Sequence, residues 1–188
     1  MLVLRELAYG PRRFSELKTD LQGISANVLT QRLTELENRG LVRKTKLPPP
    51  ASVQVYEATP WGLEVVPLIA SLGKWAARSP LHNPELRMSH VSVVMSLQTL
   101  ISPERATGID AKVGFRFGDA SYVTWVHDGQ LDVERRATEG CDLTFIGPPS
   151  AVAGVIHGGA PLETIRIEGD MDLAKRFVTL FPLPPKVG

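Results

Sequence analysis

Apolar residues over the first 40 positions recur every three or four residues, with breaks at glycine and proline. This is the period of a helix that buries one face. Gly10-Pro11 ends the first segment, and Gly23 permits a sharp turn between the second and third because glycine tolerates a left-handed backbone. Ser25 precedes the third segment and can cap it through its hydroxyl oxygen. The pattern predicts helices over residues 1–8, 14–21 and 26–39.

Two strands are predicted after these helices. Residues 41–46 and 53–58 favour extended structure, the second through alternating apolar and polar side chains. Between them, Pro48, Pro49 and Pro50 force a stiff, open turn because each proline ring fixes its backbone angle φ. The segment is therefore predicted to be a hairpin directly after the third helix.

A further helix is predicted from Thr59-Pro60, a capping residue followed by proline at the first helical position. It carries a broad apolar stripe between Leu63 and Ala76, and Pro67 is expected to kink or restart it. A stripe this apolar needs a partner surface. That surface belongs either to a second copy of the chain or to the second half of the same chain.

The third helix carries amides and hydroxyls on the face opposite its leucines, at 100° per residue. Such groups donate and accept hydrogen bonds, as reading base edges in a DNA major groove requires. The alternative is an ordinary solvated helix face. Only the first turns of a recognition helix usually reach bases. The candidates for base reading are therefore Ser25, Asn27, Thr30 and Gln31.

The second half opens with a helical pattern from Glu85 to Ile101 and then changes to period two. Gly118-Asp119 and Asp128-Gly129 are turn sequences that predict β-hairpins between the alternating segments. The remaining predicted elements are strands over 142–146 and 164–168 and helices over 149–156 and 171–181. A mostly antiparallel sheet with helices before and after it predicts a small α+β domain.

Charge separates the two halves. The whole chain carries +1, which by itself indicates no nucleic-acid partner. Residues 1–79 hold 11 lysines and arginines against 7 acidic residues, whereas residues 80–188 hold 10 against 13. A basic half joined to an acidic half favours two domains with different roles. We therefore predict domains over residues 1–79 and 85–188, joined by a linker over 80–84.

The excess positive charge lies between Arg12 and Lys46, a stretch with 8 basic and 4 acidic residues. Cations beside a groove-reading helix neutralise phosphates, which adds affinity but no sequence information. Plain solvation is the alternative for any one of these side chains. The predicted phosphate contacts are Arg12, Arg13, Arg32, Arg43, Lys44 and Lys46.

The sequence offers no catalytic or metal-binding motif. The four histidines lack metal-ligand spacing, no G-x-S-x-G occurs, and GVIHGG lacks the lysine of a phosphate-binding loop. No apolar run has the length of a membrane span, and the single cysteine, Cys141, fits a reducing compartment. We predict a cytoplasmic protein that is not an enzyme, uses no cofactor or metal and does not insert into a membrane.

Three segments carry a family resemblance: GPRRFSEL, ISANVLTQRLTELENRGLV and VYEATPWG. Over residues 1–79 they resemble the HxlR family of bacterial winged-helix transcription regulators, whose members are dimers that bind palindromic operators. The resemblance implies double-stranded DNA and a second copy of the chain as partners. It also implies that residues 25–32 enter the groove, that Arg43, Lys44 and Lys46 lie in the wing, and that the apolar helix forms a dimer interface.

The chain departs from the family pattern in two respects. Members usually begin with a further helix that carries a cysteine, whereas this chain starts inside the helix that should follow it. Either the start is misassigned or this member lacks a dimer element and the cysteine that senses redox state or aldehydes in some relatives. Position 27, often basic in the family, is asparagine here, so the base preference is expected to differ.

The second half resembles the sterol-carrier-protein-like fold in VTWVHDGQLDV, DLTFIGP, GVIHGGAP and IRIEGDMDLAKRFVTLFP. That resemblance implies an apolar tunnel for a lipid or another hydrophobic small molecule. Ordinary core packing is the alternative for each apolar residue. The predicted pocket residues are Val94, Phe115, Trp125, Phe145, Ile156 and Phe177.

These observations predict a dimeric transcription regulator on a palindromic operator, with a second domain that responds to a hydrophobic effector. The alternative hypothesis, from a different functional class, is a lipid or acyl carrier, or a sensor, whose winged domain mediates protein contacts. Salt-dependent binding to DNA that requires the basic stretch would distinguish the two hypotheses.

Overall fold

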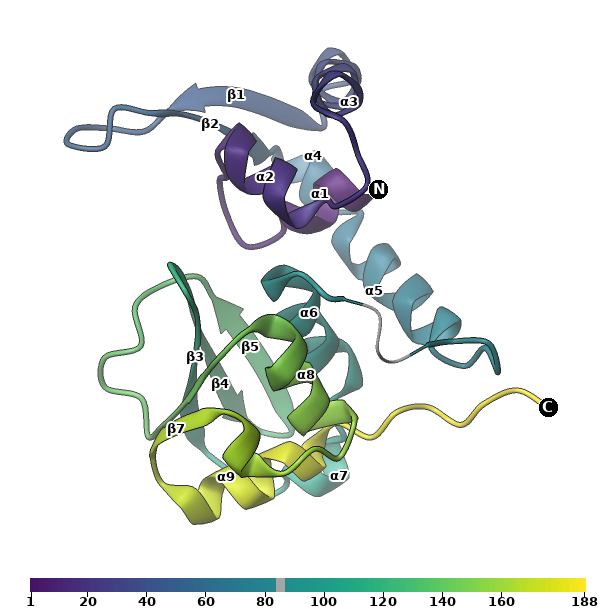
Figure 1. Ribbon diagram of the computed structural model, residues 1–188, viewed down its shortest axis with the longest axis vertical. Coiled ribbons are helices and arrows are strands. Elements are labelled where there is room, and N and C mark those ends of the chain that lie inside the picture. Colours follow the sequence, from purple (N-terminus) through teal and green to yellow (C-terminus); the bar gives the residue numbers. More distant parts are fainter. Residues whose placement is uncertain (84–86) are drawn as a thin grey trace. The chain divides into compact units, whose positions relative to one another are not determined.

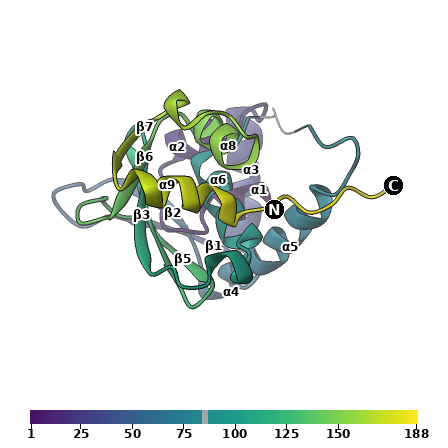
Figure 2. The same ribbon diagram turned by 90° about the horizontal axis from the view of Figure 1, so that it is seen from below.

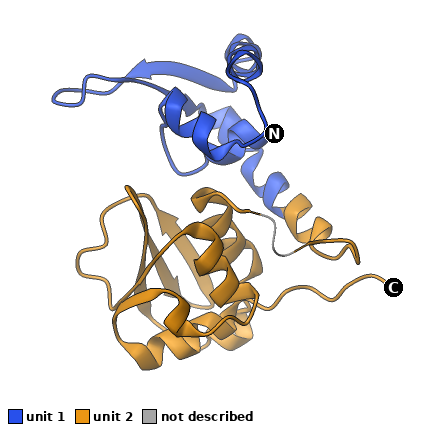
Figure 3. Cartoon of the chain, in the orientation of Figure 1, with its two compact units in different colours: residues 1–70 blue, residues 71–188 orange. Residues whose placement is uncertain are grey.

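The computed structural model describes residues 1–83 and 87–188. It divides into two compact units, residues 1–70 and 71–188 (Figures 1 and 3). This division falls inside a helix and precedes the predicted linker. Pro84, at the end of that linker, and Glu85 and Leu86, at the start of the predicted helix, lie outside the described residues.

The first unit begins with the three predicted helices, α1 (Leu2–Glu6), α2 (Phe14–Asp20) and α3 (Ala26–Asn38). Gly23 has φ +81° in the turn between α2 and α3, which confirms the need for glycine there. The core consists of apolar side chains from all three helices and the first strand: Val3, Leu4, Leu7, Leu17, Leu21, Leu29, Leu33 and Val42. Burying this shared apolar face stabilises helices that are too short to persist alone.

The hairpin consists of β1 (Val42–Lys46) and β2 (Gln54–Ala58), paired antiparallel. Thr59 then caps α4 (Pro60–Leu63) by accepting a hydrogen bond from the Gly62 N–H at 3.0 Å. Gly62 lies so close to β1 that a Cβ there would be 2.0 Å from the Leu41 carbonyl oxygen. The helix restarts as α5 (Val66–Ala76), with Pro67 at its second position, as predicted.

Arg12 joins the loop before α2 to the hairpin. Its backbone exchanges two hydrogen bonds of 2.8 Å with Tyr56 of β2 and so extends the hairpin by a third, one-residue strand. Its side chain is 2% exposed and donates to Asp20 at 2.5 Å, at the end of α2. Glu16 lies 3.7 Å from the same guanidinium. One residue therefore fixes α2 to the wing.

The second unit contains a five-stranded sheet in the order β5–β4–β3–β6–β7. Its strands are β3 (Ala111–Phe117), β4 (Ala120–His127), β5 (Gln130–Glu134), β6 (Leu143–Ile146) and β7 (Arg166–Gly169). All neighbours pair antiparallel except β3 and β6, which are parallel, so the sheet is mixed. The two predicted hairpin turns lie at Gly118 and at Asp128-Gly129, where φ is positive.

Helices α6 (His90–Leu100), α8 (Pro149–His157) and α9 (Met171–Phe177) lie on one face of this sheet (Figures 1 and 2). Helix α6 starts at His90 and is capped by Ser89. Residues 87–89, which the sequence pattern predicted to be helical, are not. A short helix that the sequence pattern did not predict, α7 (Pro103–Ala106), follows α6 and is capped by Ser102. It leads the chain into β3.

The connection from β5 to β6 lies against the other face of the sheet at Gly114. A Cβ at Gly114 would be 2.8 Å from side-chain atoms of Thr138 and 2.7 Å from the hydroxyl of Thr144. Only glycine leaves room for the chain to cross there. This crossing carries the chain past β3 and β4 and lets β6 pair parallel to β3.

We predict that Arg12→Ala destabilises the protein much more than Arg13→Ala. Removing one partner of a fully buried ion pair costs about 3–5 kcal/mol. The side chains of Asp20 and Glu16 are 15% and 34% exposed, so water partly solvates them and we expect about 3 kcal/mol, the lower end of this range. Arg13 is exposed, and its loss should change the free energy of unfolding by less than about 0.5 kcal/mol. Guanidinium unfolding followed by circular dichroism measures both variants. Equal stability of the two variants would contradict a structural role for Arg12.

Candidate functional sites

Helix α3 has the construction of a recognition helix. Ser25 caps it, with its Oγ accepting a hydrogen bond from the Val28 N–H at 3.2 Å. Leu29 and Leu33 are buried in the core, which leaves the opposite side of the helix in solvent. The first two turns thus present side chains outward from a rigidly held N-terminus.

Two amides stand on this outward side. Asn27 and Gln31 are both exposed and lie one turn apart. The Gln31 amide donates to Glu35 at 3.2 Å, and Arg32 donates to the other oxygen of the same carboxylate at 2.7 Å. Asn and Gln amides can pair with adenine through one donor and one acceptor. Glu35 therefore links Gln31 and Arg32 through its two carboxylate oxygens.

The two predicted hydroxyls already serve the helix itself. Ser25 accepts the capping hydrogen bond, and Thr30 donates to the Ala26 carbonyl at 2.9 Å. Ser25 keeps its O–H for donation, whereas Thr30 keeps only its lone pairs for accepting. The side chains with the most remaining hydrogen-bonding capacity are therefore Asn27 and Gln31.

The sequence pattern missed Val28. Its side chain is 42% exposed in the first turn of α3, between Asn27 and Thr30. An apolar side chain at such a position can contact the methyl group of thymine. A helical projection places position 28 beside position 31, at the edge of the outward face, and this is the signal that could have identified it.

The three basic residues of the wing do not share one face. Alternate side chains of β1 point to opposite sides, so Lys44 and Lys46 lie together while Arg43 points the other way. Arg43 forms an ion pair with Glu57 directly across the hairpin. Lys44 Nζ lies 5.9 Å from the centre of the Tyr56 ring. Lys44 and Lys46 therefore contribute the net positive charge of the wing.

The structure separates two neighbouring arginines that the sequence pattern treated alike. Arg12 is buried with Asp20 and Glu16, so the predicted phosphate contact is wrong for this residue. The guanidinium tolerates burial because two carboxylates of α2 lie beside it and compensate its charge. Arg13 is exposed at the start of α2, where its backbone N–H donates to Glu16 at 2.6 Å. Its side chain remains available for a phosphate.

Helix α5 has no buried residue. Leu68, Leu72 and Trp75 lie on one face of it at helical spacing and are exposed by 65%, 48% and 69%. Trp61 on α4 is also largely exposed. Leaving four large apolar side chains in water is unfavourable, and a cluster of this kind is typical of a protein interaction surface.

Five of the six predicted apolar pocket residues are buried on one face of the sheet, and Trp125 lies on the other. Phe115, Phe145 and Phe177 are fully buried, with ring centroids 5.5–6.0 Å apart, as in a packed core. Val94 and Ile156 are buried on the helices that cover the same face of the sheet. Trp125 was wrongly grouped with them. It pairs with Lys112 across β3 and β4, on the opposite face, and is 43% exposed.

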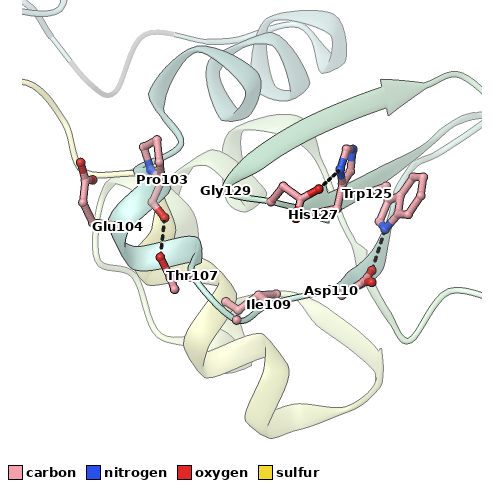
Figure 4. A pocket seen from close by; sticks show the side chains of 10 residues that line it. Pro103, Glu104, Thr107, Ile109, Asp110, Trp125, His127 and Gly129 are labelled. Carbon is pink, nitrogen blue, oxygen red and sulfur yellow. Dashed lines mark hydrogen bonds and ion pairs between the residues drawn. The ribbon is translucent and has the colours of Figure 1, made fainter.

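Trp125 instead lines a pocket of about 750 Å³ at one end of the sheet, between α7 and the turn after β4. Figure 4 shows its indole N–H directed at Asp110, to which it donates at 2.8 Å. The His127 ring lies beside it, tilted by 42°, with ring centroids 4.4 Å apart. The hydrogen bond from His127 to Asp132 raises the pKa of the imidazole, and Asp128 adds to this effect. The sequence pattern did not identify this site.

Two kinds of site are absent from the part of the chain that the structure describes. Over residues 1–83 and 87–188, no cluster of three histidine, cysteine or acidic side chains could hold a metal ion. Within the same ranges, no helix is both long and apolar enough to cross a bilayer. Cys141 is half-buried, and burial raises the pKa of its thiol, which makes it less reactive as a nucleophile.

The two units are similar to different known proteins. For the second unit, a solved structure of the UbiJ-SCP2 ubiquinone synthesis protein is 19% identical, with a TM-score of 0.36. It covers 65% of this chain and 93% of that one. The expected sterol-carrier-like fold of this unit therefore stays a resemblance.

The first unit has sequence relatives. The HxlR-like helix-turn-helix profile matches residues 1–83. YvaP from Bacillus subtilis, an uncharacterized HTH-type transcriptional regulator, is 35% identical over 75 residues, which are 40% of this chain and 69% of YvaP. YtfH from Escherichia coli, also an HTH-type regulator, is 33% identical over 75 residues, which are 40% of this chain and 60% of YtfH. The relatives are thus regulators and not enzymes, and this chain belongs to the HxlR-like helix-turn-helix family.

Proposed function

We propose that this protein is a transcriptional regulator that reads operator DNA through the first two turns of α3. The observation that carries the proposal is a capped helix with exposed amides at Asn27 and Gln31, next to a hairpin that bears Lys44 and Lys46. The amides can form hydrogen bonds with base edges in the major groove, and the wing lysines can pair with the flanking phosphates. Family membership supports the same conclusion.

Within this proposal, each residue has a role that follows from its geometry. Asn27 and Gln31 read bases by hydrogen bonds, and Val28 contacts a thymine methyl group. Ser25 orients α3 by capping it and can donate its O–H to the DNA. Contacts to phosphate are made by Arg13, Arg32, Lys44 and Lys46. Arg43, on the other side of the hairpin and paired with Glu57, contributes less to this binding.

The regulator acts as a homodimer, with α5 as the contact. Leu68, Leu72 and Trp75 form an exposed apolar face that a second copy covers by two-fold symmetry. Two recognition helices related in this way fit a palindromic operator, whose half-sites lie about one DNA turn apart. Such a protein works where chromosomal DNA is, which in a bacterium is the cytoplasm.

The second unit is the effector domain in this proposal. The alternative, a lipid or acyl carrier, needs an apolar cavity among Phe115, Phe145 and Phe177. These rings contact one another instead, which favours a regulator with a compact second unit. A hydrophobic effector therefore has less support than DNA binding.

We expect Lys44→Ala/Lys46→Ala to lower the salt dependence of DNA binding. Each phosphate contact contributes about 0.9 to the slope of log affinity against log salt, so losing both lysines should reduce the slope by about 1.8. Fluorescence anisotropy with duplex DNA across a salt series measures this. Lys112→Ala/Lys175→Ala, which removes two lysines of the second unit, is the matched control. An unchanged slope in the wing variant would exclude these lysines from the interface.

Gln31→Ala should weaken binding to specific DNA more than binding to random DNA. The target is first selected from a random duplex library with the wild-type protein. Losing a two-bond contact to a base costs about 1–3 kcal/mol on that target, whereas non-specific binding rests on phosphates and should hardly change.

Asn38→Ala, on the last turn of α3, is the control for Gln31→Ala and should leave both affinities unchanged. Equal losses on the selected and random sequences would show that Gln31 contacts no base. If the library yields no enriched sequence at any salt concentration, the regulator proposal itself fails.

Leu68→Glu/Leu72→Glu should convert the dimer into a monomer, because it places two charges inside the apolar contact. Sedimentation equilibrium should give twice the chain mass of 20.6 kDa for the wild type and the mass of one chain for the variant. Met171→Glu, an exposed apolar residue of α9, should stay dimeric. A monomeric wild type would contradict the dimer and leave the second half of the chain as the partner of α5.

A further inference from the structure

The C-terminal end of α5, which belongs to the second unit, receives hydrogen bonds from a distant part of the same unit. Helix ends leave carbonyl groups without an intrahelical partner. Here the three consecutive carbonyls of residues 77–79 all accept from residues 186–187. The Lys186 ammonium donates to Ala77 at 3.0 Å and to Ser79 at 3.1 Å. The Val187 N–H donates to the carbonyl between them at 2.8 Å, so the end of α5 is capped by another segment.

The other end of the capping segment is fixed in the core of the second unit. Phe181 is 2% exposed, and its ring lies edge-on to an aromatic ring of α9, with centroids 4.9 Å apart. The preceding carbonyl, of Leu180, accepts a hydrogen bond from the Ser102 N–H at 2.8 Å. The Arg105 side chain donates to the Thr179 carbonyl at 2.8 Å. Packing and two hydrogen bonds from α7 and its cap therefore determine where the segment starts.

The residues between these two ends form a stiff connection. Pro182, Pro184 and Pro185 each restrict the backbone, and residues 182–188 contain no helix or strand (Figure 1). A proline-rich chain stays extended and loses little conformational freedom when it docks. Leu183 and Val187 remain exposed, so the contact with α5 depends on hydrogen bonds rather than on buried apolar surface. The connection is therefore suited to carry a displacement from one of its ends to the other.

We propose that residues 182–188 are a strap through which the core around Phe181 controls the order of the C-terminal end of α5. While Phe181 is seated, Lys186 and Val187 satisfy the carbonyls of residues 77–79. Displacing Phe181 withdraws these donors and lets the last turn of α5 open. By thermodynamic linkage, fixing the end of α5 stabilises the seat of Phe181 to the same degree. The consequence for DNA binding rests on the proposed function, in which α5 is the dimer contact.

Hydrogen exchange of the full chain, with millisecond labelling, tests the capping step. The amides of Ala77, Arg78 and Ser79 are hydrogen-bonded to the last turn of α5 and report whether it is closed. Lys186→Met keeps the apolar stem but loses two hydrogen bonds, so these amides should exchange about fivefold faster. Lys175→Met, which changes an exposed lysine of α9, is the matched control and should leave them unchanged. Wild-type exchange at residues 77–79 in Lys186→Met would overturn the strap.

Arg105→Ala tests whether a change at the start of the strap reaches α5. Arg105 is exposed and binds the Thr179 carbonyl, so its loss should loosen the seat of Phe181 without unfolding the unit. Exchange at residues 77–79 should then rise about twofold, whereas Arg176→Ala, on the surface of α9, should not change it. Unchanged exchange in Arg105→Ala would reduce Lys186 to a local cap and refute control by the core.

Sedimentation equilibrium of Lys186→Met separates this inference from the proposed function. If α5 is the dimer contact, opening its last turn should weaken dimerisation about threefold. Faster exchange with unchanged dimerisation would refute the consequence for DNA binding. A monomeric wild type would contradict the proposed dimer, whereas the exchange results would still decide for or against the strap.

Discussion

The buried guanidinium of Arg12 is the constraint on which the DNA-binding unit depends. Burial to 2% exposure removes water from this charged group, and Asp20, through a hydrogen bond, and Glu16, at 3.7 Å, compensate its charge. The backbone of the same residue is paired with Tyr56 of the wing. Arg12 therefore joins α2 to the wing through one ion pair and one backbone pairing. Direct packing of α3 on β1, through Leu33 and Val42, holds the outward face of α3 beside the lysines of β1.

Sequence patterns predicted the elements of the first unit because the determinants are local. Ser25 caps α3, Gly23 permits the turn before it, and the leucine spacing selects the buried side. The role of Arg12 was not accessible in this way. Its partner Asp20 lies eight residues away and its backbone partner Tyr56 lies on the wing, so only the folded chain brings them together.

The second unit illustrates the limit of period-two patterns. Alternation along β4 correctly separates two sets of side chains, but it does not say which face the helices cover. Trp125 was predicted to line the apolar pocket with the phenylalanines, whereas the register with Lys112 and Asp132 assigns it to the open face. The sequence pattern did not predict α7, because four residues are too few to establish a helical period. The pocket was missed for both reasons.

Arg12 and Arg13 stand next to each other and carry the same side chain, yet they are open to change to very different degrees. Arg13 is exposed, and in the proposed function it contacts a phosphate, so its exchange for lysine, glutamine or serine should change DNA affinity without disturbing the fold. Arg12 has no such freedom, since even lysine lacks the planar fork that reaches Asp20 and Glu16 together. Among descendants of this protein, variation at position 13 with an invariant arginine at position 12 would be the trace of that difference. A designer who wants to retune affinity without losing the fold should begin at the second arginine.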